Sequence, residues 1–163
     1  MIVKTYNVLI VDTKNSARSI MAEALFNTMG DGVYQAYSAG SSPSGVVNRF
    51  AIEQIKTINY PTKNLRSKSW NEFLEAKTPI MNFVISLCDI DKDTLPAWHE
   101  KSIYTHWEFD DPSTVDGTFD EKKAAYKKVF QQIQNKIDLF TQLPLAHLNQ
   151  ESLNRAIEKW KSK

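Results

Sequence analysis

The stretch Thr5-Tyr-Asn-Val-Leu-Ile-Val-Asp-Thr-Lys-Asn-Ser-Ala-Arg-Ser19 sets the architecture around which the rest of the chain is arranged. It consists of an apolar segment, a short polar loop that begins at Asp12, and a helix that opens on Arg18. A strand that turns sharply into a helix leaves several backbone N–H groups without partners, and the helix dipole makes their meeting point positive. The sequence therefore predicts that residues 12–19 form a loop that binds an oxyanion.

The side chains of this loop fit the same interpretation. Arg18 offers a planar fork that matches two oxygens of a tetrahedral oxyanion, and Asn15 tolerates the left-handed backbone of a tight turn. Ser16 and Ser19 carry hydroxyls that can orient the group at position 12. The alternative is that one of these serines only caps the helix while Arg18 is a solvated charge. The expected oxyanion-binding residues are Thr13, Lys14, Asn15, Ser16, Ala17, Arg18 and Ser19.

Apolar strand-like segments alternate with helical segments along the remainder of the chain. This order predicts one α/β domain over residues 1–163, a three-layer sandwich around a four-stranded parallel sheet. Ligands bind such sheets at the carboxyl ends of the strands, which is where the loop at 12–19 falls. The predicted strands are 5–11, 33–39, 82–88 and 102–107, and the predicted helices are 18–29, 48–58, 69–76, 119–143 and 150–161.

Composition excludes several classes of function. The net charge is +1, which gives no electrostatic case for binding nucleic acid or an acidic membrane surface. No apolar run reaches the length of a membrane span, and the N-terminus lacks the pattern of a signal peptide. One cysteine offers no disulfide framework, which favours a reducing, cytoplasmic location. The three histidines, His99, His106 and His147, show no metal-ligand spacing, so neither a metal nor a cofactor is expected.

Six segments, in the same order along the chain, resemble the low-molecular-weight protein tyrosine phosphatase superfamily. The resemblance is closer to its thioredoxin-linked arsenate reductase branch and covers nearly the whole chain, so it implies the fold of that family. The segments are VLIVDTKNSARSIMAEAL (8–25), YSAGS (37–41), LRSKSW (65–70), VISLCD (84–89), HWEFDDP (106–112) and LPL (143–145).

The family's loop has the form Cys-x5-Arg, and this chain departs from it. Asp12 stands where the resemblance places the nucleophilic cysteine, and Lys14 stands where a glycine is usual, whereas Arg18 is kept. The family's general acid is an aspartate just before a proline, which corresponds to Asp111 before Pro112. From the residues alone, the favoured interpretation of Asp111 is an ordinary turn aspartate, and only the resemblance favours descent from the general acid.

The branch also implies two relay cysteines, of which only one is present. Cys88 matches the first, and the second position holds Leu95 before Pro96. A chain with one cysteine cannot close the internal disulfide that supplies two electrons to arsenate, so thioredoxin is not expected to be a productive partner. Cys88 is therefore interpreted as a structural, inert thiol.

We expect Asp12 to stay ionised, to accept the Arg18 fork and thereby to compete for its own anion site. The predicted function is a catalytically impaired phosphatase or arsenate reductase-like protein that keeps oxyanion or partner binding. Two alternatives stay open: an active phosphatase with Asp12 as covalent nucleophile, or an active enzyme whose loop cysteine was deliberately replaced. Glu108 and Asp110 are expected to be solvated loop charges, and His106 to pack at a strand end without a role.

Overall fold

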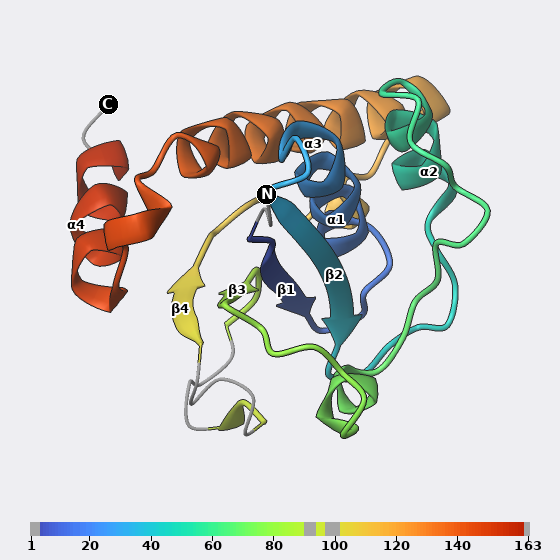
Figure 1. The fold of residues 1–163 in the computed structure, drawn as a ribbon. Helices are drawn as coiled ribbons and strands as arrows, with labels where there is room; N and C mark the ends of the chain where they lie inside the picture. Colours follow the sequence, from blue (N-terminus) through green and yellow to red (C-terminus); the bar gives the residue numbers. More distant parts are fainter. Residues whose placement is uncertain (1–3, 90–93, 97–101, 162–163) are drawn as a thin grey trace.

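The structure is a computed structural model that describes residues 4–89, 94–96 and 102–161. Figure 1 shows its helices and strands in their order along the chain. The strands are β1 (Tyr6–Asp12), β2 (Tyr34–Gly40), β3 (Phe83–Ser86) and β4 (Ile103–His106). The α-helices are α1 (Arg18–Met29), α2 (Arg49–Lys56), α3 (Phe119–Thr141) and α4 (Gln150–Lys161). The short 3-10 helices are η1 (Trp70–Leu74), η4 (Pro112–Thr114) and η5 (Leu145–His147).

The predicted elements are present, with shifted ends. The segment expected to be a helix over 69–76 is the 3-10 helix η1, because the backbone becomes extended at Glu75. Helix α3 ends at Thr141, two residues before the predicted end, since the residue before Pro144 is disfavoured in helical backbone. Most of the segment between the predicted strands 82–88 and 102–107, including His99, lies outside the described residues.

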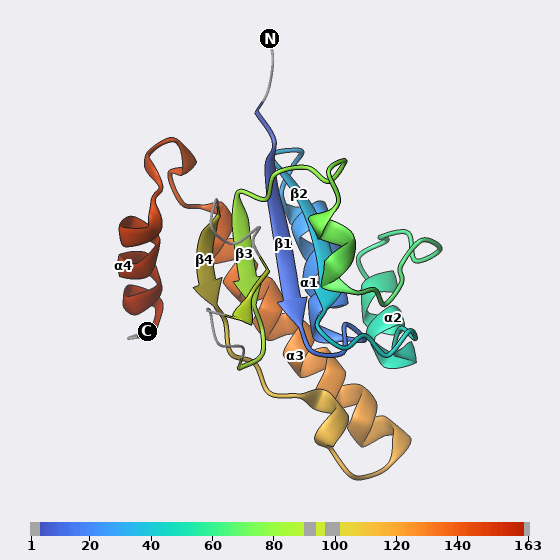
Figure 2. The same cartoon turned by 90° about the horizontal axis from the view of Figure 1, so that it is seen from below.

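The four strands form one parallel sheet, as predicted, and their order in it is β2-β1-β3-β4. The chain leaves β1 toward β2 on one side and later returns to β3 on the other side, so the direction of winding reverses between β1 and β3. The side chains of β3 are buried along its whole length, as is typical of a central parallel strand. The reversal places a ligand-binding position at the carboxyl end of β1, where the loop at 12–19 begins (Figure 2).

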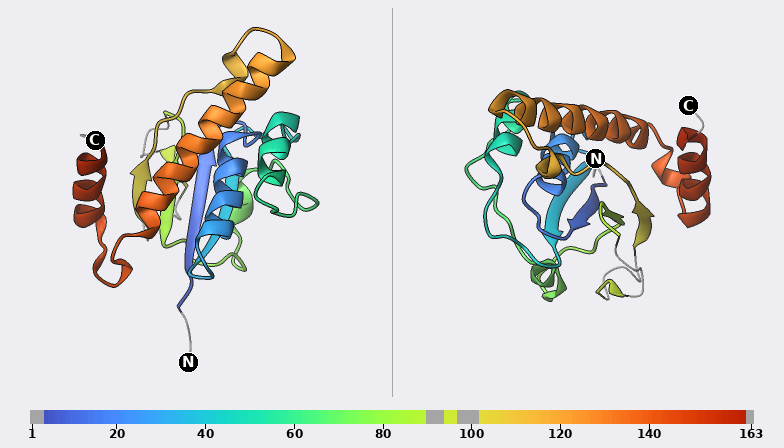
Figure 3. Two further views of the ribbon diagram at one scale, coloured as in Figure 1. Left: turned by 90° about the horizontal axis from the view of Figure 1, so that it is seen from above. Right: turned by 180° about the vertical axis from the view of Figure 1, so that it is seen from behind.

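Helices α1 and α3 cover one face of the sheet, and α2 packs against both of them (Figures 1 and 3). The main apolar core lies between these helices and the sheet. The third layer, on the opposite face, consists of η1 and short irregular segments. Trp70 and Phe73 of η1 are partly buried and pack against the apolar side chains of that face of the sheet. The buried side chains of that second face are Leu9, Val11, Ala39, Met81, Val84 and Leu95.

Helix α4 lies beside the edge strand β4 (Figure 2). The side chain of Gln150 accepts a hydrogen bond from the Tyr104 amide at 2.8 Å and donates one to the Tyr104 carbonyl at 2.6 Å. These two bonds pair backbone groups of an edge strand that would otherwise be open to another chain. Among the described helices, none combines the length and apolar character needed to cross a bilayer.

Candidate functional site

The loop between β1 and α1 is held from outside by its carbonyl groups. The carbonyls of Asp12, Thr13, Lys14 and Ser16 accept hydrogen bonds from the amides of Ser41, Ser42, Ser44 and Asn48, at 2.8–3.0 Å. In a trans peptide the N–H points opposite to the carbonyl, so the amides that follow these four carbonyls point inward. The loop therefore presents a concave row of backbone N–H groups, the arrangement that binds anions.

Asp12 lies at the base of this concavity with its residue 4% exposed. One oxygen of its carboxylate accepts a hydrogen bond from the Asn15 amide at 2.6 Å. Burial raises the pKa of Asp12 above its ordinary value, although the Asn15 amide, the Ser19 hydroxyl and the charge of Arg18 act to lower it. From the sequence, hydrogen bonds and the charge of Arg18 were expected to be the largest influences on the pKa of Asp12. That expectation was wrong, because the loop removes the carboxylate from water and burial has the larger effect.

Asn15 connects the loop to its neighbours. Its backbone is left-handed, with φ of 47°, as predicted for this position. Its side-chain amide donates to the hydroxyls of Ser19 and Ser38, and its carbonyl oxygen accepts from the Lys68 amide at 2.9 Å. Gly40 permits this close approach, since a Cβ at that position would lie 2.6 Å from the Thr13 carbonyl oxygen.

A buried ion pair supports the loop from behind, and the sequence analysis did not find it. Lys68 lies 3.7 Å from the Glu23 carboxylate, and Glu23 accepts a hydrogen bond from Ser38, the partner of Asn15. Burial raises the pKa of Glu23 and lowers the pKa of Lys68, so each charge depends on the other. The only sequence signal was that YSAGS and LRSKSW both fell within the family resemblance.

Arg18 does not pair with Asp12, which corrects the expectation of a self-closed loop. One of its nitrogens donates to the Phe109 carbonyl at 3.0 Å, and another lies 3.6 Å from the Asp111 carboxylate. The geometry explains the difference, because Asp12 is engaged by the Asn15 amide at the base while Arg18 starts α1 and reaches across to the loop after β4. Neither Ser16 nor Ser19 caps α1, whose N-cap is Ala17 without a side-chain bond, so that alternative was wrong as well.

Asp111 is both a turn residue and a wall of the site. Its extended backbone precedes η4, and its carboxylate accepts from the amide and hydroxyl of Ser113. Burial acts to raise the pKa of Asp111, but the two Ser113 bonds and the charges of Arg18 and Lys14 outweigh it and leave the pKa below its ordinary value. Asp111 is thus held as an anion, opposite Arg18.

These groups line one cavity of about 330 Å³. Two cationic side chains and two carboxylates face it, with the Tyr126 ring of α3 on one side. Every sequence-predicted loop residue except Asn15 and Ser19 lies on its wall, and those two support it from within the loop. The lining residues are Asp12, Thr13, Lys14, Ser16, Ala17, Arg18, Asn48, Asp111, Ser113 and Tyr126.

The two positions that the resemblance assigns to relay cysteines do not line this cavity, although the Cys88 thiol is close to Thr13 on its wall. Cys88 is half-buried in a smaller cavity of about 170 Å³ on the other side of Arg18, and burial raises the pKa of its thiol. Leu95 is 5% exposed and packs in the apolar cluster on the second face of the sheet. A raised thiol pKa favours the protonated, less nucleophilic form.

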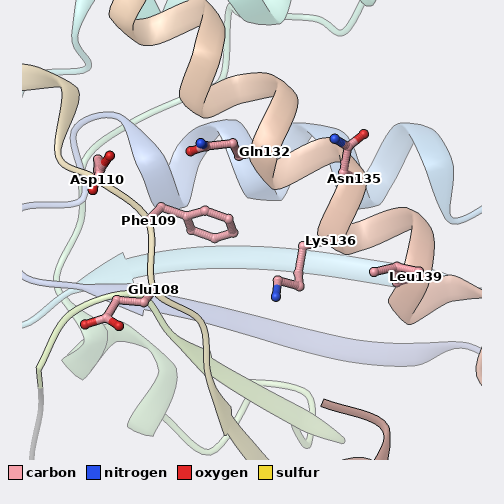
Figure 4. Close-up of a pocket in the computed structure, with 7 residues that line it drawn as sticks. All are labelled: Glu108, Phe109, Asp110, Gln132, Asn135, Lys136 and Leu139. Atoms are coloured by element: carbon pink, nitrogen blue, oxygen red, sulfur yellow. The ribbon is translucent and has the colours of Figure 1, made fainter. Parts of the chain in front are cut away.

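A further hollow of about 380 Å³ lies between α3 and the loop after β4 (Figure 4). The Phe109 ring lies beneath α3, whereas the Glu108 carboxylate points away from that helix (Figure 4). This hollow shares no residue with the cavity around Asp12. Glu108 also lies with Asp89 and His106 at the carboxyl ends of β3 and β4, where sequence spacing alone had indicated no site.

Residues 7–155 match the family model of the low molecular weight phosphotyrosine protein phosphatases. The chain is 32% identical to an arsenate reductase of Halalkalibacterium halodurans over 130 residues, which is 80% of this chain and 91% of that protein. It is 29% identical to an arsenate reductase of Bacillus subtilis, with the same shares of each chain covered.

Solved structures agree with this similarity. An arsenate reductase in its phosphate-binding state superimposes with a TM-score of 0.62 and 26% identity, covering 82% of this chain and 98% of that one. A low molecular weight protein tyrosine phosphatase from T. tengcongensis superimposes with a TM-score of 0.66 over 85% of this chain and 100% of that one. At 24% identity, the second likeness is one of fold.

Proposed function

The chain belongs to the low molecular weight phosphotyrosine protein phosphatase family, and from this premise we propose that it is a catalytically impaired member that still binds an oxyanion. Asp12 would stand at the nucleophile's position, Arg18 would be the oxyanion-binding fork, and Asp111 would descend from the general acid. Localisation in the reducing cytoplasm is part of the same proposal, because the chain has one cysteine.

One observation carries the proposal: the group at the base of the amide-lined loop is a buried carboxylate that accepts the Asn15 N–H. An anion in that position takes up a donor that would otherwise serve a bound oxyanion. A carboxylate is also a weaker nucleophile than a thiolate, and aspartyl nucleophiles in other enzyme classes act with Mg²⁺ held by further carboxylates. The loop from Thr13 to Ser19 contains no further carboxylate.

Arsenate reduction by the thiol relay is not available to this chain under the proposal. Reduction of arsenate takes two electrons, which thiols supply by ending as a disulfide. The sequence has a single cysteine, and the position of the second relay cysteine is the buried, apolar Leu95. Thioredoxin therefore has no internal disulfide to reduce.

Retained oxyanion binding is supported by the other half of the site. Arg18 and Lys14 line the cavity, and the carbonyl bonds that turn the loop amides inward are present, although Asp12 accepts the Asn15 amide. A solved relative with 26% identity is described as an arsenate reductase in a phosphate-binding state. We propose that this chain also binds phosphate, but weakly, because the carboxylates of Asp12 and Asp111 line the same cavity as the cationic side chains of Lys14 and Arg18.

Hydrolysis of p-nitrophenyl phosphate tests the proposal. The chain as it stands should show no turnover above an Arg18→Ala control, whereas Asp12→Cys should gain at least about a hundredfold if the rest of the loop is intact, since losing a nucleophile costs several orders of magnitude in rate. Asp12→Asn is the matched control that keeps the size but adds no nucleophile. Turnover by the unaltered chain that Asp12→Cys does not exceed would contradict the proposal.

The second candidate is an active phosphatase that forms an aspartyl phosphate on Asp12. What favours it is that Asp12, Arg18 and Asp111 line the same cavity, where a nucleophile and a carboxyl group for proton transfer would both be needed. The lowered pKa of Asp111, which disfavours its protonated form, counts against this candidate. The same assay separates the two, because this candidate requires Asp12→Asn to abolish a measurable activity of the unaltered chain.

A further inference from the structure

Three donor side chains converge at the carboxyl ends of β3 and β4, outside the cavity around Asp12. One ligand atom from each of Asp89, His106 and Glu108 lies within 4.8 Å of the other two. His106 ends β4, and its backbone partner in the sheet is Ser86 at the end of β3. Because the two strands are parallel neighbours, Asp89 after β3 comes close to His106 and Glu108 at the end of β4, although it is distant from both in sequence.

We propose that Asp89, His106 and Glu108 form a binding site for a divalent metal ion of the zinc class. One imidazole nitrogen and two carboxylates are ligands that Zn²⁺ accepts, and three protein ligands leave a position open for water. In a tetrahedral site such donors stand about 3.4 Å apart, given metal–ligand distances near 2.1 Å. The three ligand atoms lie within 4.8 Å of one another, somewhat farther apart than this spacing. Asp89 and Glu108 are exposed, so their carboxylates can move closer by turning about their side-chain bonds.

The orientation of the His106 ring is the strongest support for this site. Its Nδ1 lies 2.9 Å from the hydroxyl oxygen of Ser86, which is fully buried. That hydroxyl oxygen is in turn 2.6 Å from the Tyr104 hydroxyl. With Nδ1 carrying the proton and donating to Ser86, the lone pair of Nε2 is available for a metal. Metal-ligating histidines are held in this way by a hydrogen bond from their other nitrogen.

The charges around the site allow a cation. Arg18 and the Cys88 thiol line the same cavity of about 170 Å³. The Arg18 guanidinium is turned to the Phe109 carbonyl and Asp111, and Asp89 and Glu108 supply two negative charges. The proposal requires only the three donors Asp89, His106 and Glu108, and no thiolate. None of the three proposed metal ligands lines the cavity around Asp12, although Arg18 lies on the wall of both cavities.

Binding of Zn²⁺ to the full-length protein tests the site, with isothermal titration at neutral pH and Co²⁺ absorption as a second readout of coordination. We expect the unaltered protein to bind one equivalent of Zn²⁺. The dissociation constant should be at least about tenfold higher in His106→Asn, Asp89→Asn and Glu108→Gln. Ser86→Ala should weaken binding by about tenfold, as the loss of an orienting hydrogen bond typically does. His147→Asn, on the exposed η5 helix, is the matched control and should bind like the unaltered chain.

Circular dichroism of each variant separates loss of the site from loss of the fold. Absence of stoichiometric Zn²⁺ binding in the folded protein would overturn the proposal. So would binding that survives both His106→Asn and Glu108→Gln. Binding that is lost in Cys88→Ser but kept in Asp89→Asn would also overturn it, since that result assigns the metal to a different, thiol-based set of ligands.

Discussion

Asp12 is a buried acid in a loop whose backbone amides point inward, and this combination defines its behaviour. The inward amides stabilise its charge, while its removal from water works against that charge and is the larger effect. Arg18 would have offset the cost by direct pairing, but it is engaged with Phe109 and Asp111. The ionised carboxylate is thus held in place at a cost to the stability of the folded protein.

Replacing Asp12 by asparagine should stabilise the protein at neutral pH. Because the folded pKa of Asp12 is raised, its contribution to stability is greatest below the unfolded value near 3.8 and falls as pH rises toward the folded pKa. The gain in Asp12→Asn should therefore be near zero at pH 3.5 and grow to a plateau at pH 7. One pKa unit corresponds to about 1.4 kcal/mol, so urea unfolding of both proteins across this range reads out the shift. A difference that does not vary with pH would contradict this assignment.

Asn15 carries both a backbone and a side-chain role, and two substitutions separate them. Asn15→Gly keeps the left-handed backbone but loses three side-chain hydrogen bonds, two of them buried and one partly buried, which should cost about 2–4 kcal/mol. Asn15→Ala should cost about 1–2 kcal/mol more because of backbone strain. The control is the same pair of substitutions at Asn59, which is exposed and also has positive φ. There, Asn59→Ala should lose stability relative to Asn59→Gly through backbone strain alone. Equal unfolding free energies for the two Asn15 variants would show that strain is absent.

At the scale of elements, the loop is positioned by contacts between segments that are distant in sequence. Asn15 bonds to Ser38 of β2 and to the backbone before η1, and Glu23 of α1 pairs with Lys68. The ion pair is largely buried, with side chains 12% and 10% exposed. The loop shape is therefore a joint property of α1, β2 and the segment before η1.

Lys68→Met should destabilise the protein by about 3–5 kcal/mol, because it leaves the Glu23 charge buried without its partner. The double variant Glu23→Gln/Lys68→Met should recover most of that loss, since no unpaired charge remains. A double-mutant cycle by urea unfolding measures the coupling. A single-variant loss below about 1 kcal/mol would mean that Glu23 is not held by Lys68.

Gln150 should be the residue that secures the β4 edge. Gln150→Ala removes both of its bonds to the Tyr104 backbone and should cost about 1–3 kcal/mol. Hydrogen exchange of the Tyr104 amide should accelerate in that variant. Gln131→Ala, at an exposed position of α3, is the control and should leave both values unchanged. Unaltered exchange at Tyr104 would rule out this role.

At the scale of the molecule, the sequence predicted what depends on local pattern. Alternating apolar segments gave the parallel sheet, and the polar turn after β1 gave the loop with left-handed Asn15. The partner of Arg18 was not predictable, because Phe109 and Asp111 reach it only through the fold. The cluster of Asp89, His106 and Glu108 was missed for the same reason, since the register of β3 with β4 creates it. The pKa direction of Asp12 required knowledge of its burial.

The sheet order places the whole site at one point of the molecule. Reversal of winding between β1 and β3 leaves the carboxyl ends of these strands free for loops from both halves of the chain. The first loop supplies Asp12 and Arg18, and the loop after β4 supplies Asp111. The central claim of this account is that Asp12 takes up anion-binding capacity that the arrangement would otherwise offer to a ligand.

Sulfate titration of the unaltered protein and Asp12→Asn between pH 4.5 and 8 tests this claim most directly, because sulfate keeps its charge over that range. We expect Asp12→Asn to bind sulfate at least about tenfold more tightly than the unaltered protein at pH 7.5, because it removes the repulsion between the ionised Asp12 and sulfate. Its affinity should change little with pH. The unaltered protein should gain affinity as pH falls and Asp12 becomes neutral, and Arg18→Ala should bind weakly throughout. Equal affinities of the first two proteins across the range would contradict the claim.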